Sequence, residues 1–159
     1  MIDFAILAPI PLEHLESGRA IVETTGFVAF GSRKWEMFRK IDNDRNGKAV
    51  PVLIYPSHNA EGAQMPVKCN WLGWYIGHVE SLNGKHPEGD LHRPISTESD
   101  AIGHWAIFWH LAHLRPLETD EQVKIQDIQT IRGGWRKNSP PRGPELIATP
   151  PGLIYPVSL

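Results

Sequence analysis

Residues Val50–Ser81 read VPVLIYPSHNAEGAQMPVKCNWLGWYIGHVES, and we expect the rest of the chain to be organised around them. Two β-type runs, Val50–Tyr55 and Trp71–Glu80, flank a loop of Pro, Ser, His, Asn and Gly. The first run is almost wholly apolar, which predicts a strand at the centre of a sheet, covered on both faces. The second run contains Gly73 and Gly77, and glycines inside a strand mark a bulge or a close approach of another group. We therefore expect an aromatic strand beside a polar loop, which suits the wall of a pocket for a flat ligand.

The segments before this hairpin predict strands that alternate with short helices. Phe4–Ile10 and Thr24–Gly31 have the β-branched and aromatic content of strands, and Pro11–Ile21 permits a short helix. Ser32–Ile41 is the strongest helical segment, because Ser32 suits an N-cap and an apolar stripe follows it. The stripe consists of Trp35, Phe38 and Ile41.

The second half of the chain predicts one long strand and a proline-rich end. Gly103–Leu114 reads as a strand covered on both faces, and Glu121–Ile131 as a short helix or a last strand. We expect residues 1–131 to form the domain, with 132–159 an extended Pro- and Gly-rich segment packed on it. Between Arg132 and Gly143 there are cations and no acid, with Trp135 among them. Either this segment holds phosphates while Trp135 stacks on a base, or Trp135 packs on the domain.

Composition places the chain among globular proteins of one domain. Its 159 residues allow a real core, and its net charge of −2 argues against coating phosphate backbones through bulk charge. No apolar run approaches the roughly 20 residues that span a bilayer, and the start of the chain carries Asp3 and no basic leader. The single cysteine, Cys69, fits a reducing cytoplasm and is expected to be inert. The sequence thus predicts a cytoplasmic protein without a membrane partner.

The segment DNDRNG after the main helix has the spacing of a calcium loop. Asp42, Asp44, Asn46 and Gly47 match loop positions 1, 3, 5 and 6, but Leu53 stands where a bidentate Glu is needed. A plain turn is therefore the favoured interpretation, and a calcium site is the alternative. The His-containing stretches match no metal-ligand spacing, so we expect no metal and no cofactor.

The order of these elements resembles the PUA-like superfamily, especially its EVE and YTH branches. The likeness covers roughly residues 3–130 and depends on Ile54–Asn59, IYPSHN, and Tyr75–Glu80, YIGHVE. It implies an α+β fold, a small mixed or antiparallel β-barrel with flanking helices. It also implies a pocket that holds one nucleotide base, often a modified one, read by stacking and edge hydrogen bonds.

The methyladenine cage of YTH readers does not transfer to this chain. Val28 stands where such readers have a Trp, and Leu82–Gly89 contains no aromatic residue. The base would instead be held by Phe30, Tyr55, Ser57, Asn59, Trp71, Trp74 and Trp105. Phosphates would be bound by Arg33, Lys34, Arg39, Arg132, Arg136 and Lys137. The expected partner is DNA or RNA, modified or single-stranded.

Two alternatives remain open. The ASCH branch of the same superfamily includes hydrolases, and Lys34, Thr25 and Glu80 are the nearest counterparts of its Lys, Thr and Glu, for action on a nucleoside or RNA. The second alternative is a module that docks a protein partner through exposed aromatic side chains. We favour the binding module over the enzyme.

Overall fold

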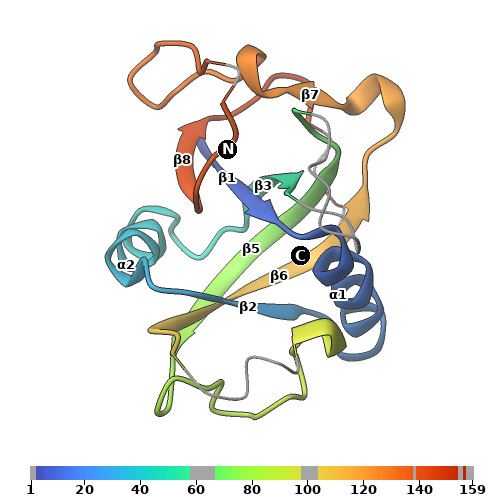
Figure 1. Ribbon diagram of the computed structural model, residues 1–159. Helices are drawn as coiled ribbons and strands as arrows, with labels where there is room; N and C mark the ends of the chain where they lie inside the picture. The colour runs from blue at the N-terminus through green and yellow to red at the C-terminus, as the bar shows by residue number, and fades with distance from the viewer. Residues whose placement is uncertain (1–2, 58–66, 98–103, 138, 154–155, 157–159) are drawn as a thin grey trace.

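The fold is α+β and contains one main sheet (Figure 1). The computed structural model describes residues 3–57, 67–97, 104–137, 139–153 and 156. Within these residues, two α-helices accompany a six-stranded sheet of order β2-β6-β5-β3-β1-β8, in which only β1 and β3 pair in parallel. The elements of the first half are β1 (Phe4–Ile10), α1 (Leu12–Thr25), β2 (Val28–Ser32), α2 (Trp35–Asp44) and β3 (Val50–Pro56). The rest are β4 (Lys68–Cys69), β5 (Trp71–Glu80), β6 (Ile107–Pro116), β7 (Val123–Lys124) and β8 (Glu145–Ala148), with 3-10 turns at Thr119–Glu121 and Ile125–Asp127.

The predicted strand–helix order is confirmed up to β6, with two corrections to its boundaries. Glu121–Ile131, expected to be a short helix or a last strand, instead contains the two-residue β7 and a 3-10 turn. α1 runs on to Thr25 and ends where Gly26 takes a left-handed φ of 98° and donates its N–H to the Val22 carbonyl. The strand expected from Thr24 therefore begins only at Val28. Ser32 is not an N-cap, because it is the last residue of β2 and pairs with Ile107.

The expectation of a closed barrel is wrong, since β2 and β8 are the two edges of an open sheet among the described residues. β1 pairs with β3 on one side and with β8 on the other, so neither of its hydrogen-bonding edges is left to join β2. β8 lies in the Pro- and Gly-rich segment 132–159, which thus contributes a strand to the sheet. None of the described helices is long and apolar enough to cross a membrane.

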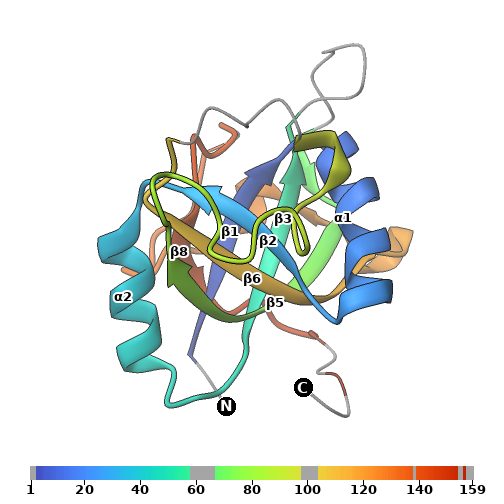
Figure 2. The same ribbon diagram turned by 90° about the horizontal axis from the view of Figure 1, so that it is seen from below.

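Strand alternation divides the core into two clusters, one on each face of the sheet. β3 is buried over its whole length and supplies both clusters, as predicted for a central strand. α1 and α2 both pack into the first cluster, on opposite sides of the molecule in Figure 2. The second cluster is closed by β8 and by the turn that contains Ile125 and Ile128.

The glycines of β5 mark the irregularities that the sequence predicts. The pairing of β5 with β6 shifts between Tyr75 and Gly77, where Gly77 has a φ of 142°, and this confirms a bulge. A Cβ at Gly73 would lie 3.2 Å from a methyl carbon of Leu111, which confirms a close approach. A further shift lies between Leu72 and Trp74, opposite the stretch of β6 in which His113 has a φ of 51°.

Candidate functional site

The aromatic residues expected to hold a base are divided between the two faces of the sheet. Phe30 and Trp71 belong to the first core cluster, whereas Tyr55 and Trp74 belong to the second. None of these four residues is more than 7 % exposed. Trp71 and Trp74 lie three positions apart in one strand, so their side chains point to opposite faces. The four rings therefore do not surround one slot.

The remaining residues of that set lie elsewhere. Trp105 packs directly on Gly31, where an added Cβ would lie 2.4 Å from the indole, and its ring lies 4.3 Å from that of His104. Ser57 follows β3, and its N–H donates to the Ile10 carbonyl over 3.1 Å. Asn59 lies outside the described residues.

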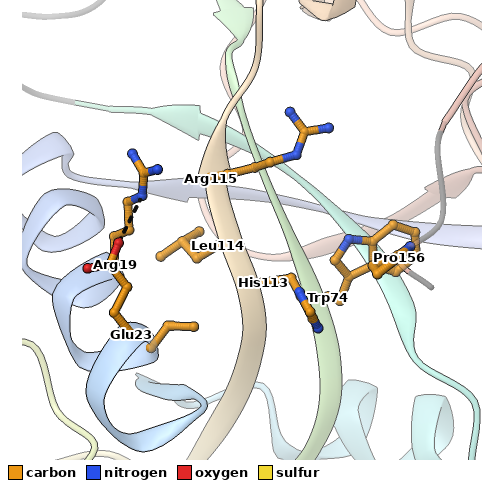
Figure 3. A pocket seen from close by; sticks show the side chains of 8 residues that line it. Arg19, Glu23, Trp74, His113, Leu114, Arg115 and Pro156 are labelled. Carbon is orange, nitrogen blue, oxygen red and sulfur yellow. Dashed lines mark ion pairs between the residues drawn. The ribbon is translucent and has the colours of Figure 1, made fainter. Parts of the chain in front are cut away.

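An open cavity of about 390 Å3 extends around the end of β6, with residues of α1 on one side and Trp74 and Pro156 on the other (Figure 3). Trp74 is 1 % exposed, so it contributes only a small part of its ring to the wall. The other lining residues come from α1, from β6 and from the C-terminal segment. They are Arg19, Val22 and Glu23, then His113, Leu114 and Arg115, and finally Pro156.

The cavity has an apolar wall and a charged rim. Val22, Leu114 and Pro156 share the wall with the edge of Trp74. Arg19 lies on the rim, where its Nε is 3.7 Å from Oε1 of Glu23, one turn further along α1. Such an exposed pair is weak and leaves both groups available to a ligand.

Arg115 is held in place by a two-pronged ion pair. Its Nη1 and Nη2 donate to Oε1 and Oε2 of Glu121 over 3.1 and 3.0 Å. These bonds lower the pKa of the Glu121 carboxyl to about 2, so the pair stays charged over the whole physiological range. A guanidinium carries five N–H donors, so Arg115 keeps donors for a ligand after binding Glu121.

The backbone at His113 reorganises the end of β6. With a φ of 51°, His113 lies in the left-handed region, which is uncommon for a residue other than glycine. Leu111 and Leu114 consequently both reach the first core cluster, although an odd spacing in a regular strand would separate them. His113 and Arg115 are two positions apart, and both line the cavity.

Sequence reasoning did not single out Arg19, Glu23, His113 or Arg115. The cavity forms between a helix and a strand nearly a hundred residues apart, and no local pattern marks that contact.

The cations expected to bind phosphates at the start of α2 do lie together. Arg33 and Lys34 line an open hollow of about 440 Å3 with Trp35. Trp35 was assigned to the buried stripe of this helix, but it is 42 % exposed, with the guanidinium carbon of Arg39 4.9 Å from its ring centroid. Lys34 Nζ donates to the Pro144 carbonyl over 2.7 Å.

The C-terminal cations are not equivalent. Arg136 is ion-paired with Glu145 and donates to the Ser139 carbonyl, so it holds the segment together. Arg132 and Lys137 are exposed. Trp135 is 67 % exposed, so the interpretation that it packs on the domain is wrong.

The residues of the hydrolase alternative do not converge. Thr25 ends α1 and precedes β2, whereas Lys34 follows β2, so the strand separates them. Thr25 Oγ1 donates to the Ile21 and Phe27 carbonyls, which are each 2.9 Å away. Glu80 is ion-paired with Arg39 at 3.3 Å. The expected Lys, Thr and Glu therefore share no site.

The segment expected to form a turn or a calcium loop is engaged by the protein itself. Arg45 Nε and the Tyr75 hydroxyl both donate to Oδ1 of Asp42, over 2.7 and 2.9 Å. Asp44 accepts from Lys40 over 2.5 Å. Throughout the described part of the chain, no three His, Cys, Asp or Glu side chains form a group that could hold a metal ion.

Comparison of the chain with protein-family models, with curated proteins and with solved structures gives no match in any of the three.

Proposed function

We propose that the protein is a nucleic-acid-binding module and that the cavity beside Trp74 receives one base of the bound strand. The observation that carries this proposal is the combination of an apolar wall with Arg19 and Arg115 at the rim of a single cavity. Its volume of about 390 Å3 lies within the range of roughly 300–1,000 Å3 typical of ligand pockets.

The two sides of this cavity suit the two sides of a nucleotide. A base has flat apolar faces, which can pack on Val22 and Pro156. Leu114 and Trp74 add little surface, because they are only 4 % and 1 % exposed. Its polar edge needs donors and acceptors, which Glu23 and the His113 imidazole supply. Since most of the Trp74 ring is covered by protein, the base packs against the edge of the ring and does not stack on its full face.

The phosphates of the same strand would be bound by exposed cations outside the cavity. Arg33, which precedes α2, and the pair Arg132 and Lys137 are exposed and supply positive charge without a bulk positive surface. Binding through a few such contacts is compatible with a net charge of −2 and is sensitive to salt.

The family proposal and the compartment proposal have separate support. The order strand, helix, strand, helix, strand from β1 to β3 supports the proposed relation to PUA-like domains, whereas the open sheet differs from the barrel that this relation implies. The proposed reducing cytoplasm is supported by the single cysteine of the chain, Cys69, which is a free thiol. Burial raises its pKa to about 12, so it is unreactive.

The direct test is calorimetric titration with the four common 5′-mononucleotides. We expect saturable binding by the unaltered protein and a Kd at least about 10-fold weaker in both Arg19→Ala and Arg115→Ala, because each loses a charged donor. Lys48→Ala is the matched control, since it removes one exposed cation on the loop between α2 and β3. Equal binding by all four proteins, or no binding at millimolar nucleotide, would contradict the proposal.

A protein-docking function is the second candidate, because some large apolar side chains are exposed. Leu82, Leu91 and Ile95 are each more than half exposed and lie on one segment of the chain. A protein complex formed through these apolar side chains would persist at high salt, whereas contacts to phosphates weaken steeply as the salt concentration rises. Retention of a partner in 1 M NaCl, lost in Ile95→Ala, would support this candidate.

A further inference from the structure

Trp135 is exposed, yet it is held on a well-bonded hairpin. Trp135 pairs with Gln129 as an antiparallel bridge, and the Thr130 N–H donates to the Gly134 carbonyl over 2.7 Å. Gly133 closes the turn with a φ of 96° and donates its N–H to the Thr130 carbonyl over 3.0 Å. The hairpin continues beyond the tryptophan, where the Arg136 N–H donates to the Ile128 carbonyl over 2.9 Å. The exposed indole is thus presented from a fixed backbone.

A second cavity, of about 240 Å3, lies against this indole. Its apolar lining includes Val123, Ile128, Pro150 and Pro151 together with Trp135. A large aromatic ring with most of its surface in water beside an apolar hollow is typical of a recognition site. The core clusters do not require Trp135, because neither of them includes it.

The charges around Trp135 indicate which partner fits. Arg132 precedes Trp135 at the tip of the hairpin and Lys137 follows it, and both are exposed. Arg136 does not add to this charge, because it is paired with Glu145. One acid, Asp127, lines the cavity. Two exposed cations flanking an exposed indole match a strand of alternating bases and phosphates.

We propose that Trp135 is a second base-stacking subsite, at which a single-stranded nucleic acid stacks one base while Arg132 and Lys137 contact its phosphates. This inference depends on the proposed function and adds a contact point outside the cavity beside Trp74. A proline-rich peptide is the rival occupant of an aromatic groove. It is disfavoured because Pro150 and Pro151 of this chain already line the hollow with Trp135.

The test compares a long and a short probe. Fluorescence anisotropy would measure binding of a labelled 12-nucleotide single strand, and calorimetry would measure binding of 5′-mononucleotides. Loss of one stacked base corresponds to about 5- to 150-fold in affinity. We expect Trp135→Ala to weaken the 12-mer by that factor and to leave mononucleotide binding unchanged, with Trp135→Phe retaining most of the affinity.

Ile95→Ala is the matched control, because Ile95 is 66 % exposed and lies outside both cavities. Melting temperatures of all variants should agree, since Trp135 is not part of the core. If the 12-mer binds and Trp135→Ala binds it equally well, the second subsite is refuted while the proposed function stands. If the unaltered protein binds neither probe, the proposed function fails and the second subsite with it. Binding of a decaproline peptide, lost in Trp135→Ala, without binding of the 12-mer would overturn the inference in favour of a peptide site.

Discussion

Asp42 connects α2 to β5 through a partly buried network. Its carboxylate accepts from Arg45 and Tyr75, and its Oδ2 lies 2.6 Å from Nδ1 of His78. Burial first, and then the neighbouring Asp42 charge, raise the pKa of the Tyr75 hydroxyl, which stays protonated and donates. Removing the carboxylate takes one acceptor from Arg45 and one from Tyr75, but Arg45 keeps its bonds to the Lys48 and Ile76 carbonyls and Tyr75 keeps its contact with His78.

We predict that Asp42→Ala lowers the free energy of unfolding by about 1–3 kcal/mol, because Arg45 Nε and the Tyr75 hydroxyl each lose an acceptor. Urea denaturation at pH 7 measures the change. Asp44→Ala is the matched control, since Asp44 forms an exposed pair with Lys40 that is worth less than about 1 kcal/mol. An equal decrease in the free energy of unfolding in the two variants would show that the Asp42 network stabilises the fold no more than an exposed ion pair does.

Gly31 cannot carry a side chain without moving Trp105, which packs against it. An added Cβ would lie 2.4 Å from the Trp105 ring, and a bulky indole cannot be displaced at low cost. Gly31→Ala should therefore cost about 1–3 kcal/mol by overpacking. At Gly134 the nearest atom would be 3.6 Å away, so Gly134→Ala serves as the control with little expected effect. Similar melting temperatures for both variants would contradict the close packing of Trp105.

The sequence DNDRNG shows what local reasoning can and cannot predict at this scale. Its turn residues were recognisable, and Asn46 and Gly47 do adopt left-handed φ values of 51° and 72°. The role of the Asp42 carboxylate was not recognisable, because Tyr75 lies 33 positions away and its approach depends on how α2 packs on β5.

At the scale of elements, the segment before β6 is fastened to the sheet by histidines. His86 Nδ1 accepts the Glu88 N–H, so its proton is on Nε2 and is donated to His110 Nε2 over 3.1 Å. The Phe27 ring lies 3.9 Å from that of His92 and 4.4 Å from that of His110. The groups facing this cluster are Glu88 and Arg93 of the segment itself, His78 of β5 and Thr25 of α1. Protonation of His110 Nε2 would place a second N–H between the two rings, and the hydrogen bond to His86 would be lost.

Acid should therefore destabilise this attachment. Burial, more than any neighbouring charge, lowers the pKa of His86, and it lowers that of His110 to about 4. The histidine pKa is about 6.5 in the unfolded chain, so between pH 6.5 and pH 4 the unfolded state binds more protons than the folded state. The free energy of unfolding is therefore highest above pH 6.5 and falls as the pH decreases through that window. Chemical denaturation at several pH values measures the slope. His110→Gln keeps an acceptor for His86 but does not titrate, so it should flatten the profile, and an unchanged slope would contradict this account.

The C-terminal edge strand is the element that sequence reasoning missed. β8 has only four residues among prolines and glycines, and its partner β1 lies at the other end of the chain. No short-range pattern predicts such a pairing. The longer apolar runs of β1, β3 and β5 were predictable, because burial on both faces leaves a continuous apolar signal.

A chain shortened to residues 1–131 should consequently aggregate or unfold. It would expose the edge of β1 and remove Ile147, which is fully buried in the second core cluster. In the full chain, Ile147→Ala should cost about 2–5 kcal/mol. Size-exclusion chromatography and thermal denaturation measure both effects, and a stable monomeric 1–131 chain would show that β8 is dispensable.

At the scale of the whole molecule, the aromatic residues explain why the predicted site was misplaced. The surplus of tryptophan was read as one ring-lined slot, but strand alternation sends Trp71 and Trp74 to opposite faces, where they fill two cores. The cavity that does border Trp74 forms where α1 packs on β6, and tertiary contacts of this kind cannot be read from spacing. The resemblance supplied the idea of a base pocket but not its position.

The small number of proposed phosphate contacts predicts a modest response to salt. If Arg33, Arg132 and Lys137 each neutralise one phosphate of a single strand, log Kd should rise with log salt with a slope of about 2, at roughly 0.7 per contact. Titrations of a 12-nucleotide strand between 50 and 200 mM NaCl measure this slope. A slope near zero would point to a partner held by apolar contacts, and a much steeper slope would require cations outside this set.

The central claim is that a nucleotide base enters the cavity beside Trp74, and indole N–H resonances test it residue by residue. In a 15N–1H spectrum titrated with a 5′-mononucleotide, the resonance of Trp74, assigned with Trp74→Phe, should shift saturably. The resonance of Trp135 should stay in place, and Arg115→Ala should weaken the response at Trp74. A Trp74 resonance that does not move, while shifts appear only at other tryptophans or nowhere, would contradict the account.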